Sequence, residues 1–342
     1  MPESDVLDET YERLYCTGPE FDGWLANHGP MAADALIRIG RAEQVAGWVT
    51  EYERRLEEVP SDRWVISEED WREPLGDPTR LGDWCALFAR LVHEEQWEGL
   101  IGRWWPRLLP GAVASATHGL IRTGHVVRAL REHQSPQRLN ELGRALGYWA
   151  ARWQPLSDEV PHGAADIGAA LDGVPAIGAS GDARTRLAQL GETLAWIPAL
   201  GRLRPVERPA AVPAALDALV DAVVTRYEQW AHGNPVMLVH AATAPRAAAL
   251  VLPALPTEMW IATYNTAWAL SAAISAAYRP ATPPPSGLER AAVSAEDVID
   301  IAVATRDEHA IKFVEVAHES YRRGNPRALA AGALAGALLG AE

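Results

Sequence analysis

The sequence is poor in lysine and in cysteine, and both shortages are informative. Lysine and arginine together number 31, yet Lys312 is the only lysine, so nearly all cationic contacts must be made by arginine. The only cysteines are Cys16 and Cys85. Two cysteines exclude a disulfide-built secreted scaffold, and we expect a protein of a reducing compartment.

Basic charge is scarce relative to acidic charge. Aspartate and glutamate number 45, which gives a formal net charge of −14. This balance argues against a general nucleic-acid-binding protein and against a protein held on anionic lipid by charge.

The sequence also lacks an uninterrupted apolar run of the ~20 residues that a membrane span requires. The runs near residues 208–225 and 236–255 are broken by charged residues and prolines, and the run 328–340 is too short. The N-terminus is acidic with no apolar stretch behind it, which predicts no signal peptide. We therefore expect a cytoplasmic protein that does not bind a membrane.

Apolar residues make up 48% of the 342 residues, enough for a sizeable core. They recur at helical spacing, and no convincing alternating strand pattern occurs. The composition shifts nowhere strongly enough to separate two domains. The sequence predicts an all-α fold, in which residues 1–342 form a single domain of antiparallel helices that enclose a buried cavity. The predicted helices cover residues 41–58, 78–102, 111–132, 137–154, 184–197, 212–231, 257–278, 294–304 and 306–323.

The last of these helices has clear sequence signals at both ends. Thr305 followed by Glu308 forms a capping-box pattern, and Asp307 adds favourable charge in the first turn. Gly324 and Pro326 follow its end. The pattern predicts a helix from about residue 306 to residue 323.

The chain has ten histidines but no local metal motif such as HExxH or paired CxxC. A metal site would therefore have to combine distant segments. His28 precedes Gly29 and Pro30, and the positive end of the helix expected there would keep its imidazole neutral, as metal ligation requires. His118 and His125 lie two helical turns apart on one face, so one could support the other at a site. His240 stands in an apolar run, where a lone histidine is more often a core residue than a ligand.

His309 and Lys312 are three residues apart and project from one face of the helix predicted over 306–323. The surrounding run HAIKFVEV is largely apolar, which favours burial of this face. A buried lysine is pushed towards the neutral amine, and a neutral amine can add carbon dioxide to form a carbamate, an anionic oxygen ligand. The alternative is an ion pair between Lys312 and Glu308 or Glu315.

Four short motifs occur in order over nearly the whole chain: NHGPM at 27–31, HGLIRTGH at 118–125, ALGYWAARW at 145–153 and DEHAIKF at 307–313. In these motifs the chain resembles the questin oxidase-like family. Members are associated with oxidative tailoring of aromatic polyketides, especially oxygen-dependent opening of anthraquinone-type rings. The resemblance implies a helical fold and a mononuclear non-haem iron, Fe(2+). In at least some members four histidines and a carboxylated lysine hold the metal.

The resemblance implies a ligand set when it is transferred position by position. The motif histidines are His28, His118 and His309, and the lysine of HAIK is Lys312. His240 is the remaining ligand, because it is the only histidine in an apolar context between residues 163 and 308. Further residues expected to support the ligands are His125 and Glu315. Some members were described as using NADPH, but no nucleotide-binding motif supports that cofactor here.

The sequence thus predicts an iron-dependent oxygenase that uses O2 to cleave or rearrange a ring of an aromatic polyketide, with Lys312 as its catalytic residue as well as a ligand. Two alternatives stay open. A metal with a carbamylated lysine also serves hydrolysis, in which metal-bound water is the nucleophile. A non-catalytic helical binding protein, with scattered core histidines, would need no metal at all.

Overall fold

The structure is a computed structural model that describes residues 3–178, 180–282 and 293–340. The backbone contacts divide the chain into two compact units. Unit 1 holds Met1–Pro155 and Leu250–Met259, and unit 2 holds Leu156–Ala249 and Trp260–Glu342. Each unit is described by itself below.

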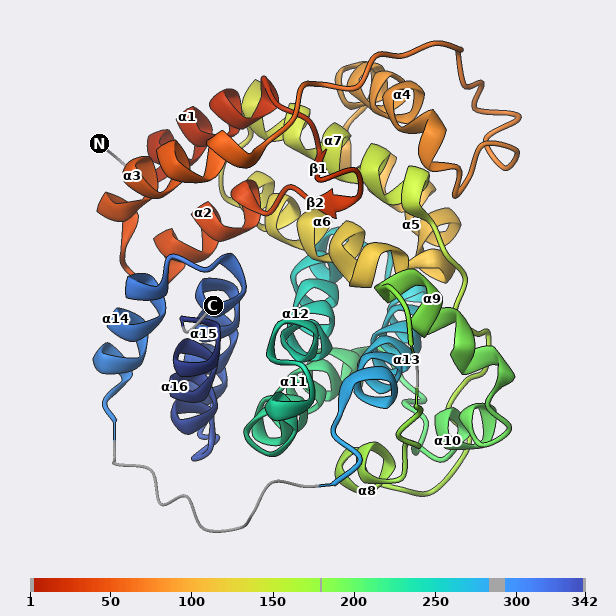
Figure 1. Cartoon of the computed structure of the whole chain (residues 1–342). Helices are drawn as coiled ribbons and strands as arrows, with labels where there is room; N and C mark the ends of the chain where they lie inside the picture. Colours follow the sequence, from red (N-terminus) through yellow and green to blue (C-terminus); the bar gives the residue numbers. More distant parts are fainter. Residues whose placement is uncertain (1–2, 179, 283–292, 341–342) are drawn as a thin grey trace. The chain divides into compact units, whose positions relative to one another are not determined.

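The described part of unit 1 contains seven α-helices and one short antiparallel pair of strands, in which Glu20 faces Ala26 (Figure 1). They are α1 (Glu3–Tyr15), β1 (Glu20–Phe21), β2 (Leu25–Ala26), α2 (Gly29–Arg38), α3 (Ala42–Tyr52), α4 (Leu81–Glu94), α5 (Trp97–Leu108), α6 (Ala114–Glu132) and α7 (Pro136–Arg152). Short 3₁₀ turns occur at Glu53–Arg55, Pro78–Arg80, Leu109–Gly111, Leu252–Ala254 and Thr257–Met259. Helices α1, α2 and α3 pack on one another, and α7 packs against both α4 and α6.

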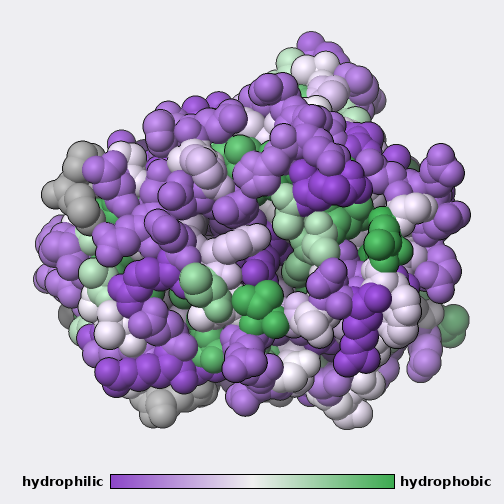
Figure 2. Space-filling model, turned by 90° about the horizontal axis from the view of Figure 1, so that it is seen from above, coloured by the Kyte–Doolittle hydropathy of each residue, from purple (hydrophilic) through white to green (hydrophobic). Residues whose placement is uncertain are grey.

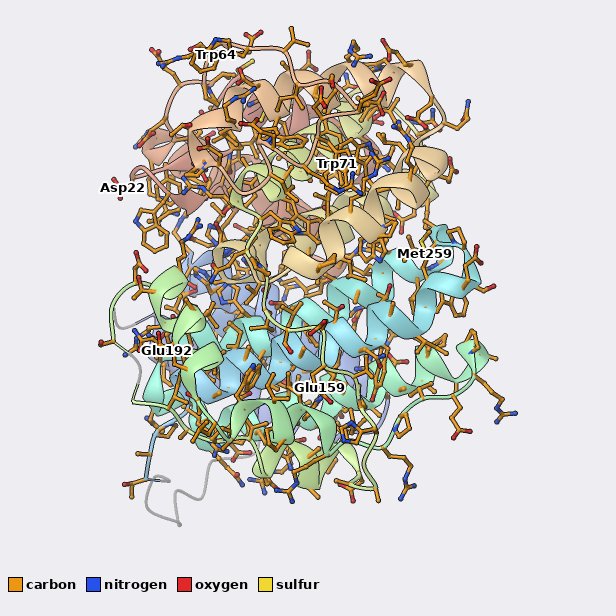
Figure 3. All side chains as sticks on the ribbon, turned by 90° about the vertical axis from the view of Figure 1, so that its right-hand side faces the viewer. Asp22, Trp64, Trp71, Glu159, Glu192 and Met259 are labelled. Atoms are coloured by element: carbon orange, nitrogen blue, oxygen red, sulfur yellow. The ribbon has the colours of Figure 1, made fainter. Side chains whose placement is uncertain are left out.

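Aromatic side chains fill the core of unit 1 beside α4 and α5. The rings surround Trp104. The Phe88 centroid lies 4.7 Å from the Trp104 centroid, and the centroids of Trp84 and Trp71 each lie 5.9 Å from the Trp104 centroid. Burial of such rings stabilises the fold by a few kcal/mol each, about 2–3 by area. In Figure 3, Trp71 lies inside the unit, whereas Trp64 stands at its edge and is 62% exposed.

The described part of unit 2 contains nine α-helices. They are α8 (Ile167–Asp172), α9 (Ala183–Ala188), α10 (Trp196–Gly201), α11 (Val212–Trp230), α12 (Pro235–Val251, with its last two residues counted in unit 1), α13 (Trp260–Tyr278), α14 (Ala295–Thr305), α15 (Glu308–Arg322) and α16 (Ala328–Leu339). Short 3₁₀ turns occur at Gln189–Glu192, Pro209–Ala211 and Ala231–Gly233.

Helix α16 packs closely against α14 and α15 because its contact face is made of small residues. A Cβ added at Gly332 would come within 2.7 Å of Val298 on α14, and one at Gly336 within 2.5 Å of Ile301. The three helices therefore lie side by side (Figure 1), and α15, which carries His309 and Lys312, is held between well-packed neighbours.

The structure confirms the all-α fold expected from the periodicity. That residues 1–342 form a single domain with an enclosed cavity stays a prediction. The predicted ends of several long amphipathic helices agree with the structure within a few residues. Examples are 212–231 for α11 (Val212–Trp230) and 294–304 for α14 (Ala295–Thr305).

Four helix predictions were wrong in detail. The helix predicted over 41–58 ends at Tyr52 and is followed only by the 3₁₀ turn Glu53–Arg55. The helix predicted over 78–102 is two helices, because Glu95 and Gln96 have extended backbone angles. The helix predicted over 184–197 ends at Ala188 and resumes as α10 only at Trp196. The last long helix begins at Glu308 and not at 306, and its N-cap is Asp307, not Thr305, which ends α14.

One apolar helical segment, Pro235–Ala254, is long and apolar enough to cross a membrane, but most of its residues are buried. Core helices of soluble proteins show the same combination of length, apolar composition and burial. Hydrophilic residues cover most of the face in Figure 2, and apolar residues lie there in small separate groups.

Candidate metal ligands

His28 lies in unit 1 at the start of α2, where its backbone carbonyl accepts a hydrogen bond from Ala32. Its backbone N–H donates to the hydroxyl of Tyr52 at 2.6 Å. The glycine that follows leaves room for the side chain of Leu14, since a Cβ at Gly29 would come within 2.6 Å of a terminal methyl group of Leu14. The sequence HGP thus fixes a buried imidazole at the positive end of a helix, where the neutral form is favoured.

His118 is held by an unusual piece of backbone at the start of α6. Ser115, Ala116 and Thr117 all have left-handed φ angles, of 44°, 54° and 74°. Left-handed backbone is costly for residues with a Cβ, about 1–2 kcal/mol each. The Ser115 carbonyl accepts a hydrogen bond from Nδ1 of His118. Because a carbonyl can only accept, the proton is on Nδ1, and Nε2 of His118 carries the lone pair.

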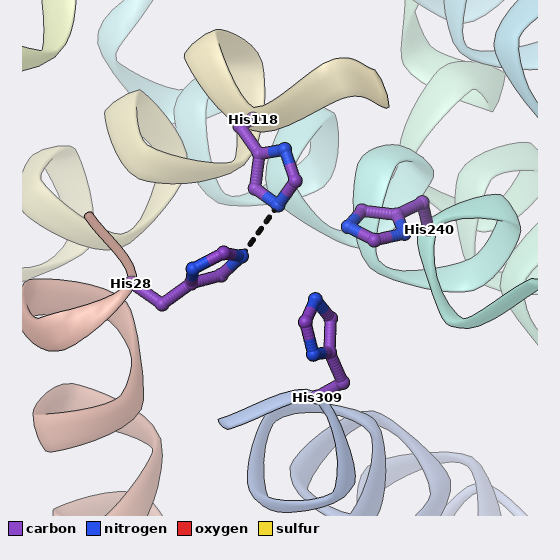
Figure 4. A group of neighbouring side chains, drawn as sticks. All are labelled: His28, His118, His240 and His309. Carbon is purple, nitrogen blue, oxygen red and sulfur yellow. Dashed lines mark hydrogen bonds between the residues drawn. The ribbon is translucent and has the colours of Figure 1, made fainter. Parts of the chain in front are cut away.

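The Nε2 atoms of His28 and His118 lie 2.7 Å apart, with the two rings nearly perpendicular (Figure 4). Two lone pairs would repel at this distance. Since Nε2 of His118 is the acceptor, the metal-free pair must hold a proton on Nε2 of His28, and a metal ion would take the place of that proton.

His240 and His309 form the second pair, in unit 2, with ring centroids 5.4 Å apart (Figure 4). Nδ1 of His240 donates to the carbonyl of Met237 at 3.2 Å, so its Nε2 also carries the lone pair. Nδ1 of His309 faces the Asp307 carboxylate at 3.8 Å.

Asp307 shapes the start of α15. Its carboxylate accepts hydrogen bonds from the backbone N–H groups of His309 and Ala310, each at 2.8 Å. Burial opposes ionisation of this carboxyl, but the interactions with His309 and the backbone hold its pKa below the usual value. Asp307 therefore caps the helix, and the same carboxylate lies near the His309 ring, at a distance longer than a hydrogen bond.

Lys312 lies one helical turn after His309 and is 1% exposed. Its Nζ is buried and has no hydrogen-bond partner among the described residues. Burial lowers the pKa of Lys312 to about 8, although Glu308 and Asp307 act in the opposite direction. With that pKa, roughly a tenth of the Lys312 population is neutral amine at pH 7 and about half at pH 8.

His125 and Glu315 were expected to support the ligands. Nδ1 of His125 contacts the fully buried carboxylate of Asp34 at 2.8 Å, and Arg128 also donates to that carboxylate. The combination holds the pKa of Asp34 far below its usual range: burial opposes ionisation, but Arg128 and His125 outweigh it. Glu315 is buried on α15, one turn beyond Lys312.

All four histidines are buried, and each offers one ring nitrogen that could bind a metal ion. In His118 and His240 the Nδ1 hydrogen bond leaves Nε2 available, which is the arrangement usual for metal-binding histidines. Neutral imidazoles of this kind suit iron, copper, nickel and zinc. The chemistry of the donor set therefore fits a transition metal.

Some residues that position these side chains were not identified from the sequence. Tyr52, Ser115 and Asp34 act through contacts that depend on the fold or on an irregular backbone. The run VASATHG before α6 gives no sign of a left-handed turn, since it contains no glycine there. Asp307 was noted only for its charge, whereas its role as cap could have been read from the Asp-x-x-Ala spacing before the apolar run.

Comparison with models of known protein families and with curated protein sequences gave no match to this chain.

Proposed function

We propose that His28, His118, His240 and His309, with Lys312, bind one metal ion, and that the protein is a metal-dependent enzyme. The observation that carries this proposal is the amine of Lys312, which is buried without a hydrogen-bond partner among the described residues. A lone buried ammonium is costly. An amine in this position serves best as a neutral group that can be converted into a ligand.

Carboxylation gives Lys312 that role. The nitrogen lone pair forms a bond to the carbon of CO2, one N–H proton leaves to solvent, and the product is a carbamate with one negative charge. This charge adds a hard oxygen donor to the imidazole nitrogens and offsets the charge of a metal ion. An arginine could not take part, because it stays protonated.

The proposed activity is that of a non-haem iron oxygenase acting on an aromatic polyketide of the anthraquinone type, with ring cleavage or rearrangement by O2. The motifs around His28, His118 and His309 support this class by their resemblance to the questin oxidase-like family. Iron(II), when bound, supplies the dioxygen chemistry. The chain's own residues hold the ligand rings in place through Ser115, Met237 and Asp307, and their burial excludes water.

The unique lysine makes the metal and carbamate parts of the proposal directly testable. Protein loaded with zinc, which is diamagnetic, and incubated with ¹³C-bicarbonate should give one side-chain carbamate signal by NMR. Lys312→Met should abolish that signal and the stoichiometric metal, and His118→Ala should also lose the metal. A wild-type protein that holds no metal, or a Lys312→Arg variant that keeps full metal content, would contradict the proposal.

The oxygenase assignment has a separate test. Iron-loaded protein with a hydroxylated anthraquinone as probe should consume dioxygen, as followed with an oxygen electrode, and Lys312→Met should not. Conversion of the probe at an unchanged rate without oxygen would instead establish a hydrolase. No oxygen uptake by metal-loaded wild-type protein would refute the oxygenase while leaving the metal result intact.

A further inference from the structure

A second cluster of polar side chains lies in the core of unit 1, where α4, α6 and α7 pack together. Arg122 on α6 and Arg144 and Tyr148 on α7 are all buried. Each has a donor with no hydrogen-bond partner among the described residues: Nη1 of both arginines and the hydroxyl of Tyr148. Buried donors are nearly always satisfied in folded proteins, so these three point to a partner that is not part of the chain.

The three side chains are neighbours. Arg122 donates through Nε and Nη2 to the two carboxylate oxygens of Glu141, at 2.5 and 2.7 Å. Glu141 precedes Arg144 by three residues and Tyr148 follows it by four, which puts all of them on one face of α7. Cys85 of α4 closes the cluster, since a Cβ on the neighbouring Gly147 would come within 3.0 Å of the Cys85 backbone.

The charges of these groups do not cancel. Glu141 compensates Arg122, but Arg144 has only neutral partners: its Nη2 donates to the Tyr15 carbonyl at 3.1 Å, and its guanidinium lies 4.6 Å from the Tyr15 ring. No carboxylate pairs with Arg144 anywhere in the described ranges.

The remaining titratable groups of the cluster do not supply the missing negative charge. Burial raises the pKa of Cys85 to about 11, against the opposing effect of Arg144 and Arg122. Burial also raises the pKa of Tyr148, although the nearby Ser115 side chain, Arg152 and Arg122 act in the opposite direction. Glu20 is held by Arg152 in a two-point ion pair. One buried positive charge, on Arg144, is left over, and a buried unpaired charge is strongly destabilising.

We propose that a small monovalent anion of the chloride type binds in this cluster, accepting hydrogen bonds from Nη1 of Arg122, Nη1 of Arg144 and the hydroxyl of Tyr148. An ordered water could satisfy the three donors but would leave the charge of Arg144 uncompensated. The anion does both, and its site involves none of the proposed metal ligands.

Thermal unfolding of the full chain tests the proposal, with sodium chloride replacing sodium gluconate at constant ionic strength. A ligand of the native state should raise the Tm of the full chain by about 2 °C for each tenfold rise in chloride above its Kd. Bromide should act in the same way and give an anomalous-scattering peak between the two guanidinium groups. A Tm that does not depend on chloride, with water alone between the arginines, overturns the proposal.

Variants assign the effect to this cluster. Tyr148→Phe keeps both arginines and removes one donor, so the chloride dependence should shift to about tenfold higher concentration. Arg144→Met should abolish it. Tyr11→Phe is the control: its hydroxyl is also buried without a partner in unit 1, but burial, Asp34 and Glu141 raise the pKa of Tyr11 and outweigh Arg138 and Arg128, so its surroundings disfavour negative charge. Unchanged chloride dependence in Tyr148→Phe, or equal loss in Tyr11→Phe, contradicts the assignment.

Discussion

At the scale of single residues, Lys312 shows why a lysine is retained in a chain that otherwise uses arginine. Both are cations in water, but only lysine loses its proton when it is buried without a partner. Nζ of Lys312 meets that condition within unit 2, and burial lowers its pKa to about 8. An arginine at position 312 would remain charged, and its burial would make that charge costly.

The first prediction concerns the pH dependence of stability, in metal-free protein and CO2-free buffer. The unfolded chain holds the Lys312 proton up to pH about 10.5, whereas the folded chain releases it above about 8. Between these values the unfolded state binds more protons, so folding is favoured as the pH rises. Lys312→Met should therefore be more stable than wild type at pH 7 by up to about 3 kcal/mol, from 1.36 kcal/mol per pKa unit.

Urea unfolding of wild type and Lys312→Met at pH 7 and near pH 10.5 measures this difference. The advantage of the methionine variant should shrink by most of its value as the pH rises between the two. An advantage that is the same at both pH values would mean that Lys312 titrates normally in the folded chain.

At the residue scale, the sequence identified the side chains whose neighbours in the sequence are informative. The residues next to His28, His118 and His309 in the sequence predicted that each imidazole is buried. The hydrogen-bond acceptors that orient the rings could not be predicted, because the position of the Ser115 carbonyl depends on an irregular backbone. Asp34 reaches His125 only because α2 and α6 pack together.

At the scale of elements, the junction between α14 and α15 depends on two adjacent residues. Arg306 ends α14 in the left-handed conformation, with φ of 58°, and Asp307 then caps α15. Glycine is the residue that adopts the left-handed conformation without cost, and arginine is not. This strained residue lies three positions before His309.

The second prediction is that Arg306→Gly stabilises the protein by about 1 kcal/mol, because it removes the steric cost of a left-handed Cβ. Asp307→Ala should cost about 1 kcal/mol or more through loss of the cap, while Asp307→Asn should recover most of it. Thermal unfolding of the metal-free variants measures all three. A loss of stability in Arg306→Gly would show that the side chain of Arg306 matters more than its backbone angle.

The third prediction concerns the left-handed turn before His118. Ala116→Gly should stabilise the protein by about 1 kcal/mol and leave metal affinity intact, because glycine keeps the conformation that exposes the Ser115 carbonyl. Ala116→Val should lower both stability and zinc affinity, since β-branched residues tolerate this region least. Zinc titration and thermal unfolding separate the two quantities. A valine variant with normal zinc affinity would show that the turn does not position His118.

Element prediction succeeded where apolar residues follow one helix face and failed where the pattern is ambiguous. Helix α12 was not predicted, because its apolar run contains Pro245, which normally argues against a helix interior. The break between α4 and α5 was missed because both helices bury large apolar side chains and only two extended residues separate them. In both cases tertiary packing determines where the helices begin and end, and tertiary packing involves residues that are distant in the sequence.

At the scale of the whole molecule, the all-α fold was predictable because every long segment repeats at helical spacing. The pairing of segments was not. His28 and His118 are 90 residues apart, yet their Nε2 atoms lie 2.7 Å apart. No local pattern specifies such a contact, and only the resemblance of the separate motifs to one family suggested that they act together.

The last prediction follows from the proposed metal site as a whole. If one ion is ligated by His28 and His118 of unit 1 and by His240 and His309 of unit 2, its binding energy must contribute to the stability of both units. At a free metal concentration ~1,000 times Kd, that contribution is about 4 kcal/mol. Calorimetry should then show a single unfolding transition with zinc, and a lower or divided transition after chelation.

His118→Ala and His240→Ala change ligands in different units, yet each should reproduce the chelated behaviour of the entire protein. His133→Ala, which alters an exposed histidine of unit 1, should unfold like wild type. If His118→Ala affects only one of two transitions and leaves a full equivalent of zinc bound, the two histidine pairs do not share an ion. The ligand set would then have to be assigned separately to each unit.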